Sequence, residues 1–531
     1  MLGCPTMAPM TPDSALNPSD LARLAAAGIE PAEAHRQLQQ LREPPPALEL
    51  ARPCTIGDGI ERLDDEARAR LASRHDEAAA RGELSAFIPA SGAASRMFRD
   101  LLACRNDARE WTRAELDAAV AAGSEEGRAL RAFVDGIERF AFHDALAQAV
   151  TPLGSSLAAL VPAGPYRPLL AALLDPDALD FAALPKGLIP FHASAAGPRT
   201  AFEEHLAEAA QLYADADGKV RLQSTVSPEH LERFRALLDR LIAETPAKAP
   251  CYDVAFSTQE PSTDTLAIDE SGAPFRDSTG ALVLRPAGHG ALLTNLARSA
   301  VPLAMIKNID NIAAEPYRAP TIEWTRAIVG RLCELRERSH ALVRRLRDTN
   351  DTNAVGDARN FAIDTGLEPE NAHPGTAAPS RESMRALLDR PWRICGMVPN
   401  TGEPGGGPFW VRGAGGQVSR QIVESAQVRA GDAAQLAIFR AATHFNPVFL
   451  ACALDDAAGG RHDLERFVDH TAAIVTRRSA GGRNLVALER PGLWNGSMAH
   501  WNTVFVEVPL TVFNPVKTVN DLLRREHQGT K

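Results

Sequence analysis

The chain has 531 residues, which at roughly 100–200 residues per domain indicates two to four domains, or one core with large insertions. Hydrophobic residues make up 45% of the chain and charged residues 23%, which excludes a disordered, collagen-like or fibrous protein. The 57 Lys and Arg against 67 Asp and Glu give a net charge of −10, and no basic run is long enough to follow a phosphate backbone. We therefore expect no nucleic-acid partner.

The cysteines and the apolar segments indicate the cellular compartment of the protein. Its 7 cysteines are scattered, without a CxxC pair or a Cys/His cluster of zinc-site spacing, so we expect a reducing compartment and no structural zinc. No apolar run approaches the roughly 18–20 residues of a membrane helix. The first residues also lack the basic and apolar regions of a secretory signal, so we expect a cytoplasmic protein with no membrane partner.

The composition changes along the chain. Residues 1–80 are rich in Ala, Leu, Arg and Glu and predict a helical N-terminal segment, after which residues 81–531 predict one core. Ala/Leu periodicity predicts a helical insertion in that core near 107–180, and an apolar face of Ile, Trp, Val and Leu residues predicts a second one near 320–347. The polar residues of 348–385 predict a loop or linker.

Short β-type runs alternate with turns and helical segments through the core. They lie at 84–89, 254–256, 281–284, 303–306, 394–398, 409–411, 448–450 and 504–506. This alternation predicts an α/β fold in which a mixed sheet is flanked by helices.

A loop of small residues follows the first of these runs and is the first candidate site. It comprises Ser91, Gly92, Ala93, Ala94 and Ser95. Without large side chains its backbone amides can approach a phosphate, and the next residue, Arg96, adds a fixed charge. A tight strand-to-helix turn that binds nothing explains the loop equally well, because one Gly-containing loop is a weak signal.

Lys186 and Asp310 are candidates for handling phosphate charge. Lys186 lies between a proline and a glycine, where its ammonium can contact a phosphate, although a solvated lysine in a turn is the commoner explanation. Asp310 follows a predicted buried strand within Asn308-Ile309-Asp310-Asn311. A carboxylate at that edge of a sheet suits Mg²⁺ shared with substrate phosphates, whereas Asp at such a position also commonly caps the next helix.

Two polar segments can contact a base. Gln259 follows a predicted strand, and its amide has the donors and acceptor needed to bind the edge of uracil. His289 lies between Gly288 and Gly290, which permit close approach of a ligand to the backbone. Turn formation by the first segment and a surface histidine in the second are equally simple explanations.

The last candidates are Lys517 and three possible sugar ligands. Lys517 precedes Thr518, a predicted N-cap, so its ammonium would lie beside a helix N-terminus that favours an anion. A plain start of a C-terminal helix is the simpler explanation of this motif taken alone. For the sugar, Glu403 can accept bonds from hydroxyl groups, Trp410 offers an apolar face, and Asn495 offers an amide. A Gly-rich hairpin of purely structural role explains the segment 400–410 as well.

In their order along the chain these motifs resemble those of the UDP-sugar pyrophosphorylases, notably the UDP-glucose and UDP-N-acetylhexosamine enzymes. Residues 91–97 resemble their glycine-rich nucleotide loop, and Lys186 resembles the lysine that follows it. Further resemblances are to their uracil segment at 256–261, their Pro-Gly-His-Gly turn at 286–290, their metal-binding Asn-x-Asp-Asn at 308–311 and their late lysine motif at 506–523.

Two features depart from that family. The loop carries Ala93-Ala94-Ser95 where the family has more glycine, and the sequence stops just after the late lysine motif, so we expect no C-terminal β-helix domain. The whole chain is closer to a bacterial family called domain of unknown function 4301, which it resembles through residues 88–92, 402–410 and 493–496. Membership of that family implies no activity.

The resemblance implies a Rossmann-like, GT-A-like nucleotidyltransferase core. It implies Mg²⁺-dependent transfer of a uridylyl group from UTP, or of a nucleotidyl group from another nucleoside triphosphate, to a sugar 1-phosphate. In that reaction Asp310 would hold Mg²⁺, and Arg96, Lys186 and Lys517 would offset phosphate charge. Because the nucleophile is already an anion, no general base is required. The alternative is a non-catalytic nucleotide or nucleotide-sugar sensor.

Overall fold

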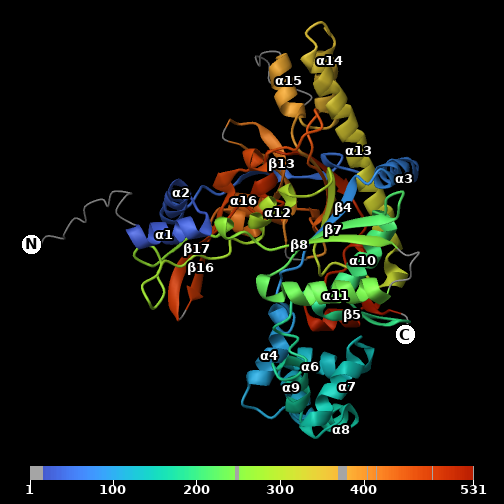
Figure 1. Ribbon diagram of the computed structural model, residues 1–531. Helices are drawn as coiled ribbons and strands as arrows, with labels where there is room; N and C mark the ends of the chain where they lie inside the picture. The colour runs from blue at the N-terminus through green and yellow to red at the C-terminus, as the bar shows by residue number, and fades with distance from the viewer. Residues whose placement is uncertain are drawn as a thin grey trace, which may run out of the picture.

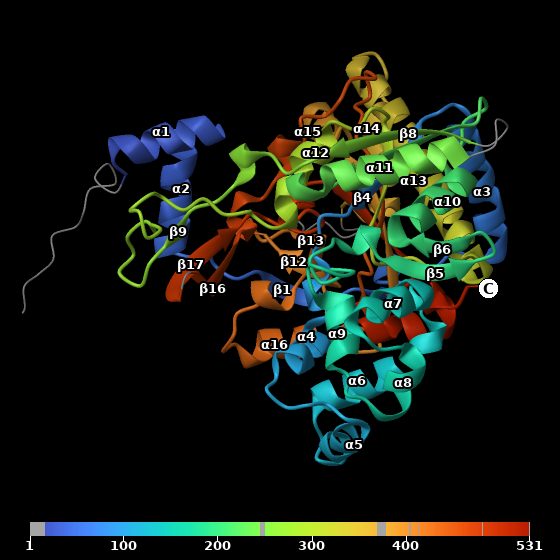
Figure 2. The ribbon, with the colours of Figure 1, turned by 60° about the horizontal axis from the view of Figure 1, so that its bottom comes forward.

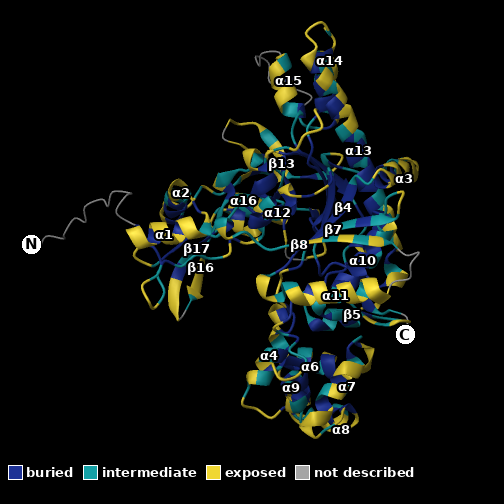
Figure 3. Cartoon of the chain, viewed as in Figure 1, coloured by how far each residue is buried: buried dark blue, intermediate teal, exposed yellow. Residues whose placement is uncertain are grey.

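Figure 1 shows the computed structural model, which describes residues 16–244, 250–368, 379–402, 405–413, 415–480 and 482–529. The fold is α/β, as predicted: a large mixed sheet lies at the centre and helices flank it. Buried residues concentrate on this sheet and on the helix faces that contact it (Figure 3).

The central sheet has ten strands in the described part of the chain. They are β2 (Thr55–Ile56), β3 (Gly59–Glu61), β4 (Leu84–Pro89), β7 (Lys219–Thr225), β8 (Cys251–Ser257), β10 (Leu303–Lys307), β11 (Trp392–Pro399), β14 (His444–Phe445), β15 (Phe449–Ala453) and β18 (Asn502–Glu507). Their order is β2-β3-β18-β11-β15-β10-β4-β7-β8, with β14 paired to β11. Along that order every pairing is parallel except the two made by β15.

This order places a topological switch point between β4 and β10. From β4 the chain continues to β7 and β8 on one side, whereas β10 pairs with the other side of β4. The two strands are parallel, so their carboxyl ends meet at one edge, where open α/β sheets bind ligands. Both strands are buried along almost their whole length and are mostly apolar, because helices cover both faces of the sheet.

Helices surround the sheet and extend from it. They are α1 (Pro18–Ala27), α2 (Pro31–Arg42), α3 (Asp65–Ala80), α4 (Arg99–Asn106), α5 (Arg113–Ala121), α6 (Glu125–Asp135), α7 (His143–Val150), α8 (Leu157–Ala163), α9 (Arg167–Leu174), α10 (Ala201–Leu212), α11 (Leu231–Glu244), α12 (Leu293–Ala297), α13 (Ala319–Arg347), α14 (Ala354–Asp364), α15 (Arg381–Leu388) and α16 (Ala433–Arg440). Helices α5 to α9 and α13 lie in the ranges where helices were predicted, near 107–180 and 320–347. In Figure 1 helices α4 to α9 form a lobe at the bottom, and α13 to α15 extend to the top.

Three smaller sheets complete the fold. One contains β1 (Glu49–Pro53), β12 (Gly407–Arg412) and β13 (Val418–Val423), and another contains β9 (Ala267–Ile268), β16 (Ile474–Ala480) and β17 (Arg483–Glu489). The third pairs β5 (Pro190–Ser194) with β6 (Gly197–Thr200). Helices α1 and α2 lie beside β9, β16 and β17 in a lobe away from the lobe of α4 to α9 (Figure 2).

Three predicted segments differ from the structure. The N-terminal segment is not only helical, because it supplies β1 to a small sheet and β2 and β3 to the central sheet. The predicted linker 348–385 contains α14, whose Ala354, Ala358 and Phe361 repeat at helical spacing and are buried, although the surrounding residues are polar. The run 281–284 makes only an isolated bridge between Leu282 and Arg276.

In the described ranges no single helix is long and apolar enough to cross a membrane, although one sharply bent pair, His143–Leu153 with Leu157–Ala163, meets the length and composition criteria jointly.

Candidate active site

Three charged side chains from distant segments meet at the carboxyl edge of the central sheet. Asp310 follows β10, Lys186 begins the short 3₁₀ helix η5 (Lys186–Leu188), and Lys517 follows β18. The Asp310 Oδ2 atom accepts a hydrogen bond from Lys186 Nζ at 2.6 Å and one from Lys517 Nζ at 3.3 Å. The side chains of Lys186 and Asp310 are only 11% exposed, whereas that of Lys517 is 53% exposed. We call this cluster the lysine–aspartate triad.

The charge of Asp310 is stabilised by its two partners. Burial alone raises the pKa of the Asp310 carboxyl, but the positive charges of Lys186 and Lys517 outweigh it and hold the pKa below its ordinary value. Asp310 is therefore ionised at neutral pH. The open ammonium of Lys517 remains reachable by a ligand.

Backbone contacts join the segments that carry Asp310 and Lys517. The Val516 N–H donates to Asp310 O at 3.0 Å, and the Asn514 N–H donates to the Asn311 side chain at 2.8 Å. Lys186 Nζ also donates to Val516 O at 2.7 Å. The position of each triad member is thus tied to that of the other two.

The loop of small residues lies directly beside Lys186. The Lys186 N–H donates to Gly92 O at 3.1 Å, and the Ala94 N–H donates to Leu184 O at 2.9 Å. The Ala94 amide is therefore engaged and cannot bind a phosphate. The residues before it in the loop, Ser91, Gly92 and Ala93, are exposed, and their amides have no partner in the described part of the chain.

The rest of this loop is also exposed. Ser95 and Arg96 face solvent, and the Arg96 guanidinium makes no hydrogen bond or ion pair with any described residue. An anion near Lys186 would therefore find free amides and a free cation on the loop. A Cβ atom added to Gly92 would meet nothing within 4 Å, so packing does not require glycine there.

The predicted helix after Lys517 is a short 3₁₀ helix, η15 (Val519–Leu523). The Asp521 Oδ2 atom accepts the N–H groups of Lys517 at 2.8 Å and Thr518 at 2.7 Å, as in a capping box. These amides are engaged, so an anion at this position would contact the Lys517 ammonium and not a free helix N-terminus.

The two base candidates lie in different surroundings. Gln259 follows β8 at the same edge of the sheet as the triad, and its Nε2 atom donates to Asp264 at 3.2 Å. His289 stacks on the Trp494 ring, with centroids 4.0 Å apart, and its Nδ1 atom accepts the Leu493 N–H at 3.0 Å. No contact joins His289 to the triad among the described residues.

The glycines on either side of His289 have structural reasons. Gly288 has a φ of +76°, a conformation that favours glycine. A Cβ atom on Gly290 would lie 2.1 Å from Pro491 O, so only glycine fits against that backbone. Backbone geometry and packing thus explain this turn without a ligand.

Two of the three sugar candidates do not contact the triad. Trp410 lies in β12, where its Nε1 atom donates to Asp58 at 3.0 Å and the Arg420 guanidinium lies 5.7 Å from its ring. Asn495 is buried, and its Nδ2 atom donates to Ile422 O at 2.9 Å. Glu403 lies outside the described residues.

One buried face of α10 supports the triad and was not predicted. His205 Nε2 lies 3.1 Å from Ile309 O, directly before Asp310. On the next turn Glu208 pairs with Lys307, the last residue of β10, with Nζ–Oε distances of 2.7 and 2.8 Å. A sequence pattern could have indicated this face: His205 and Glu208 are three positions apart in an Ala-rich helix, and residues at that spacing lie on one helix face.

The triad has one carboxylate, Asp310, so it can supply only a single side chain to Mg²⁺. No group of three or more His, Cys, Asp or Glu side chains is placed to hold a metal ion within the described ranges. Asp310 Oδ2 accepts both ammonium groups, whereas its Oδ1 atom has no hydrogen-bond partner in that same part of the chain. One carboxylate oxygen suits a Mg²⁺ ion held mainly by substrate phosphates and water.

Comparison with known proteins gives one family and several structural neighbours. No curated protein sequence matches the chain. A solved UDP-glucose pyrophosphorylase variant from Leishmania major, in complex with UDP-glucose, shares 11% identity, with 95% of this chain and 77% of that chain covered and a TM-score of 0.44. A uridine diphosphate N-acetylglucosamine pyrophosphorylase from Trypanosoma brucei shares 13% identity, with 98% and 85% covered and a TM-score of 0.48.

The family model described as Domain of unknown function (DUF4301) matches residues 17–528, nearly the whole chain. The chain therefore belongs to this family.

Proposed function

We propose that the chain is a nucleotidyltransferase that transfers a uridylyl group from UTP to a sugar 1-phosphate and releases pyrophosphate. The observation that carries the proposal is the convergence of Lys186, Asp310 and Lys517 beside the exposed amides of residues 91–93. This cluster lies at the switch point of an α/β sheet, where ligands of such sheets bind. The motif order that resembles the UDP-sugar pyrophosphorylases supports the same reaction.

The reaction needs positioning and charge neutralisation more than proton transfer. An oxygen of the sugar phosphate forms a bond to the α-phosphorus of UTP, and the bond from that phosphorus to the pyrophosphate oxygen breaks. The nucleophile is an anion, so no residue has to remove a proton. Preorganised cations at the reacting phosphates supply the main stabilisation of the transition state.

Each member of the site has a role in this proposal. Lys517, the exposed member of the triad, would contact the reacting phosphates, and Arg96 and the amides of 91–93 would hold the triphosphate. Lys186, which is mostly buried, would orient Asp310 and add positive charge. Mg²⁺ held by Asp310 and the phosphates would supply further charge neutralisation when bound.

In this proposal Gln259 is the residue that contacts the base. Gln259 lies at the correct edge of the sheet, and breaking its bond to Asp264 would free its amide for uracil. His289, Trp410 and Asn495 have no contact with the triad, so in this proposal a sugar at the triad does not depend on them.

A nucleotide or nucleotide-sugar sensor is the second candidate. It is favoured by the ion pairs within the triad, because Lys186 and Lys517 both contact Asp310 Oδ2 and so compete with a metal ion. It is also favoured by the engaged Ala94 amide, which cannot bind phosphate. A sensor would bind UTP or a UDP-sugar without turnover.

The test is pyrophosphate release from UTP, Mg²⁺ and a panel of sugar 1-phosphates. We expect release with one acceptor and a loss of at least roughly 100-fold in Asp310→Asn, the size of effect seen when one preorganised electrostatic group is removed. Asp217→Asn, in the exposed turn before β7, is the matched control and should retain full activity. An Asp310→Asn protein that is as active as the wild type would refute the role of Asp310.

Pyrophosphate release, together with the melting temperature measured with nucleotide, separates the transferase from the sensor. If no acceptor gives pyrophosphate while UTP or a UDP-sugar raises the melting temperature, the sensor is correct. If neither turnover nor binding of these nucleotides is detected, both candidates are wrong.

A further inference from the structure

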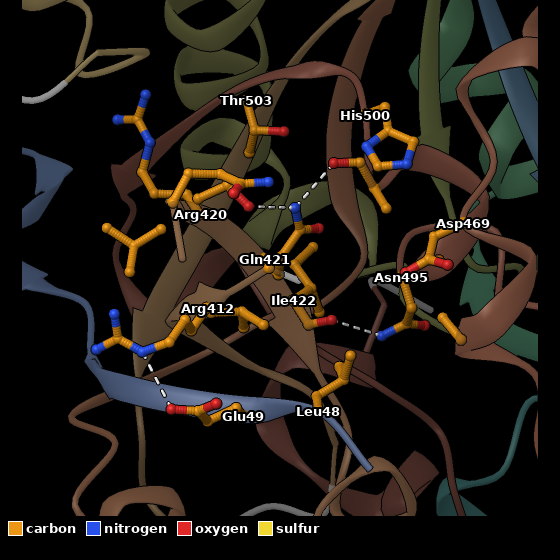
Figure 4. Close-up of a pocket in the computed structure, with 18 of the residues that line it drawn as sticks. Leu48, Glu49, Arg412, Arg420, Gln421, Ile422, Asp469, Asn495, His500 and Thr503 are labelled. Atoms are coloured by element: carbon orange, nitrogen blue, oxygen red, sulfur yellow. Dashed lines mark hydrogen bonds and ion pairs between the residues drawn. The ribbon is translucent and has the colours of Figure 1, made fainter. Parts of the chain in front are cut away.

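A second site lies at the opposite edge of the central sheet. A cavity of about 1210 Å³ is lined by Asn502 and Thr503, which begin β18, and by residues of β13 and the end of α15 (Figure 4). Because β18 runs parallel to β4 and β10 in the sheet order, its amino end lies opposite the edge that carries the triad. The cavity is thus separate from the candidate active site.

The wall of this cavity holds a buried guanidinium without an acidic partner. Arg420, on β13, is 7% exposed, and one of its nitrogens donates to Thr365 O. No carboxylate lies within 4.0 Å of it among the described residues. Burial accordingly lowers the pKa of Arg420. Glu61 acts on the guanidinium only from beyond ion-pair distance. A buried cation without a direct ion pair is costly, so an anion in the cavity would be favoured here.

Arg390, which is half-buried, is a second guanidinium in the lining of the same cavity. It follows the end of α15, its Nε atom donates only to Ala386 O at 3.0 Å, and it has no carboxylate partner in the described part of the chain. Burial lowers the pKa of Arg390 as well. Two guanidinium groups are the donors that bind a phosphate or carboxylate in a bidentate manner.

The carboxylates of the cavity wall already have partners. Glu49 pairs with Arg412 at 3.0 Å, and Glu368 pairs with Arg359 at 3.7 Å. Asp432 caps the first turn of α16, and Asp469 accepts the N–H group of Thr471 at 2.9 Å. These acidic groups do not compensate Arg390 or Arg420.

Three amide side chains add hydrogen-bond acceptors to the lining of the cavity. The amide nitrogens of Gln421, Asn495 and Asn502 donate to Ala499 O at 2.8 Å, Ile422 O at 2.9 Å and Leu387 O at 3.0 Å, respectively. Figure 4 shows the first two of these bonds as dashed lines. Because each nitrogen is engaged, each side chain is oriented, and its oxygen, which has no hydrogen-bond partner among the described residues, is left as an acceptor. Hydroxyl groups are the donors that fit such acceptors.

We propose that this cavity binds a sugar that carries an oxyanion, either a phosphate or a carboxylate. The oxyanion contacts Arg420 and Arg390, and the sugar hydroxyls donate to the oxygens of Asn495 and Asn502. Gln421 follows Arg420 in β13, so its side chain points to the other face of that strand and is assigned no contact with the sugar. The site is a binding site remote from the triad and does not depend on the proposed reaction there. Asn495, which the sequence suggested as a sugar ligand, lines this cavity and not the site around Asp310.

The test is calorimetric titration of the full chain with glucose 6-phosphate, glucuronate and glucose. We expect one of the two anionic sugars to bind to the wild type and glucose to bind at least about tenfold more weakly. Whichever anionic sugar binds identifies the oxyanion. Arg420→Gln should lose at least about tenfold in affinity, because a guanidinium that contacts the oxyanion is removed.

Two further variants keep the proposal falsifiable. Lys517→Ala should bind the anionic sugar with unchanged affinity, and loss of binding in that variant would place the ligand at the triad and overturn the proposal. Arg390→Gln should reproduce the loss if Arg420→Gln does not fold. Equal affinity in the wild type and the arginine variants, or no binding of either anionic sugar at about 10 mM, would also overturn it.

Discussion

Two sites at opposite edges of the central sheet differ in how their charges are paired. At the carboxyl edge Asp310 contacts two lysines, and Lys307 contacts Glu208. In the cavity at the amino edge Arg420 and Arg390 have no carboxylate within 4.0 Å among the described residues. A paired charge is stabilised by an opposite charge within the chain, whereas an unpaired arginine is best stabilised by an anionic ligand. The comparison therefore predicts opposite effects of removing a charge at the two edges.

The largest expected effect is at Lys307. Both Lys307 and Glu208 are almost fully buried, so Lys307→Met leaves an unpaired carboxylate and should lower the free energy of unfolding by about 3–5 kcal/mol. Denaturant unfolding followed by circular dichroism measures this change. The double variant Lys307→Met with Glu208→Leu should recover most of the loss, and a double variant as unstable as the single one would show that packing and not charge is responsible.

Asp310→Asn should have the next largest effect on stability. The substitution removes the negative charge beside the mostly buried Lys186 ammonium and leaves it with neutral oxygen acceptors such as Val516 O, so we expect a loss of about 2 kcal/mol in the free energy of unfolding. Pairing it with Lys186→Met should restore part of this loss. If the single variant is as stable as the wild type, the triad does not stabilise the fold.

The same carboxyl predicts an acid dependence. Its pKa is lowered in the folded state, so its contribution to stability is complete above the unfolded value near 3.8 and is lost as the pH falls through the folded value. The melting temperatures of wild type and Asp310→Asn should therefore differ at pH 5 and converge on acidification below about pH 4. A difference that stays constant down to pH 2 would contradict this assignment.

Arg420→Met should act in the opposite direction. No carboxylate loses its partner, and an uncompensated buried charge is replaced by an apolar side chain of similar length, so we expect the free energy of unfolding to rise by about 1 kcal/mol. Differential scanning calorimetry without added anions measures the shift. A clear decrease in melting temperature would show that Arg420 is held by the fold and that the contrast between the two edges is wrong.

The smallest effect on stability is expected at Lys517. Its side chain is half exposed, and an ion pair with such a partner contributes about 0.5 kcal/mol, so Lys517→Ala should melt close to the wild type. Its pyrophosphate release should nevertheless fall by roughly 100-fold, because the open ammonium is lost. An active Lys517→Ala protein would remove this residue from the proposed reaction.

The sequence predicted the members of the candidate site better than their arrangement. Strands β4 and β10 were identified because both are mostly apolar runs, and Lys186, Asp310 and Lys517 were each singled out by their neighbours in the chain. Their contact was not visible in any local pattern, because Asp310 lies 124 positions from Lys186 and 207 from Lys517. Only the strand order brings them together.

Almost nothing in the sequence indicated the cavity at the amino edge of the sheet. Arginines such as Arg420 and Arg390 are common on protein surfaces, and no local pattern shows that a guanidinium lacks a carboxylate partner. Helix α14 was missed for a related reason, since its buried positions are small residues within a polar segment. The absence of a partner for a side chain cannot be predicted from local sequence and is recognised only in the folded structure.

The contacts between Asp310 and the segment before Lys517 have a consequence for biosynthesis. Strands β4, β7, β8 and β10 are all complete once residue 307 has been synthesised, so four parallel strands of the sheet can pair early on the ribosome. The triad must wait for Lys517, after β18 has inserted beside β11. A nascent chain or a fragment that ends before residue 517 therefore carries much of the sheet but no complete triad, and it would be inactive in the proposed reaction until the last strand is in place.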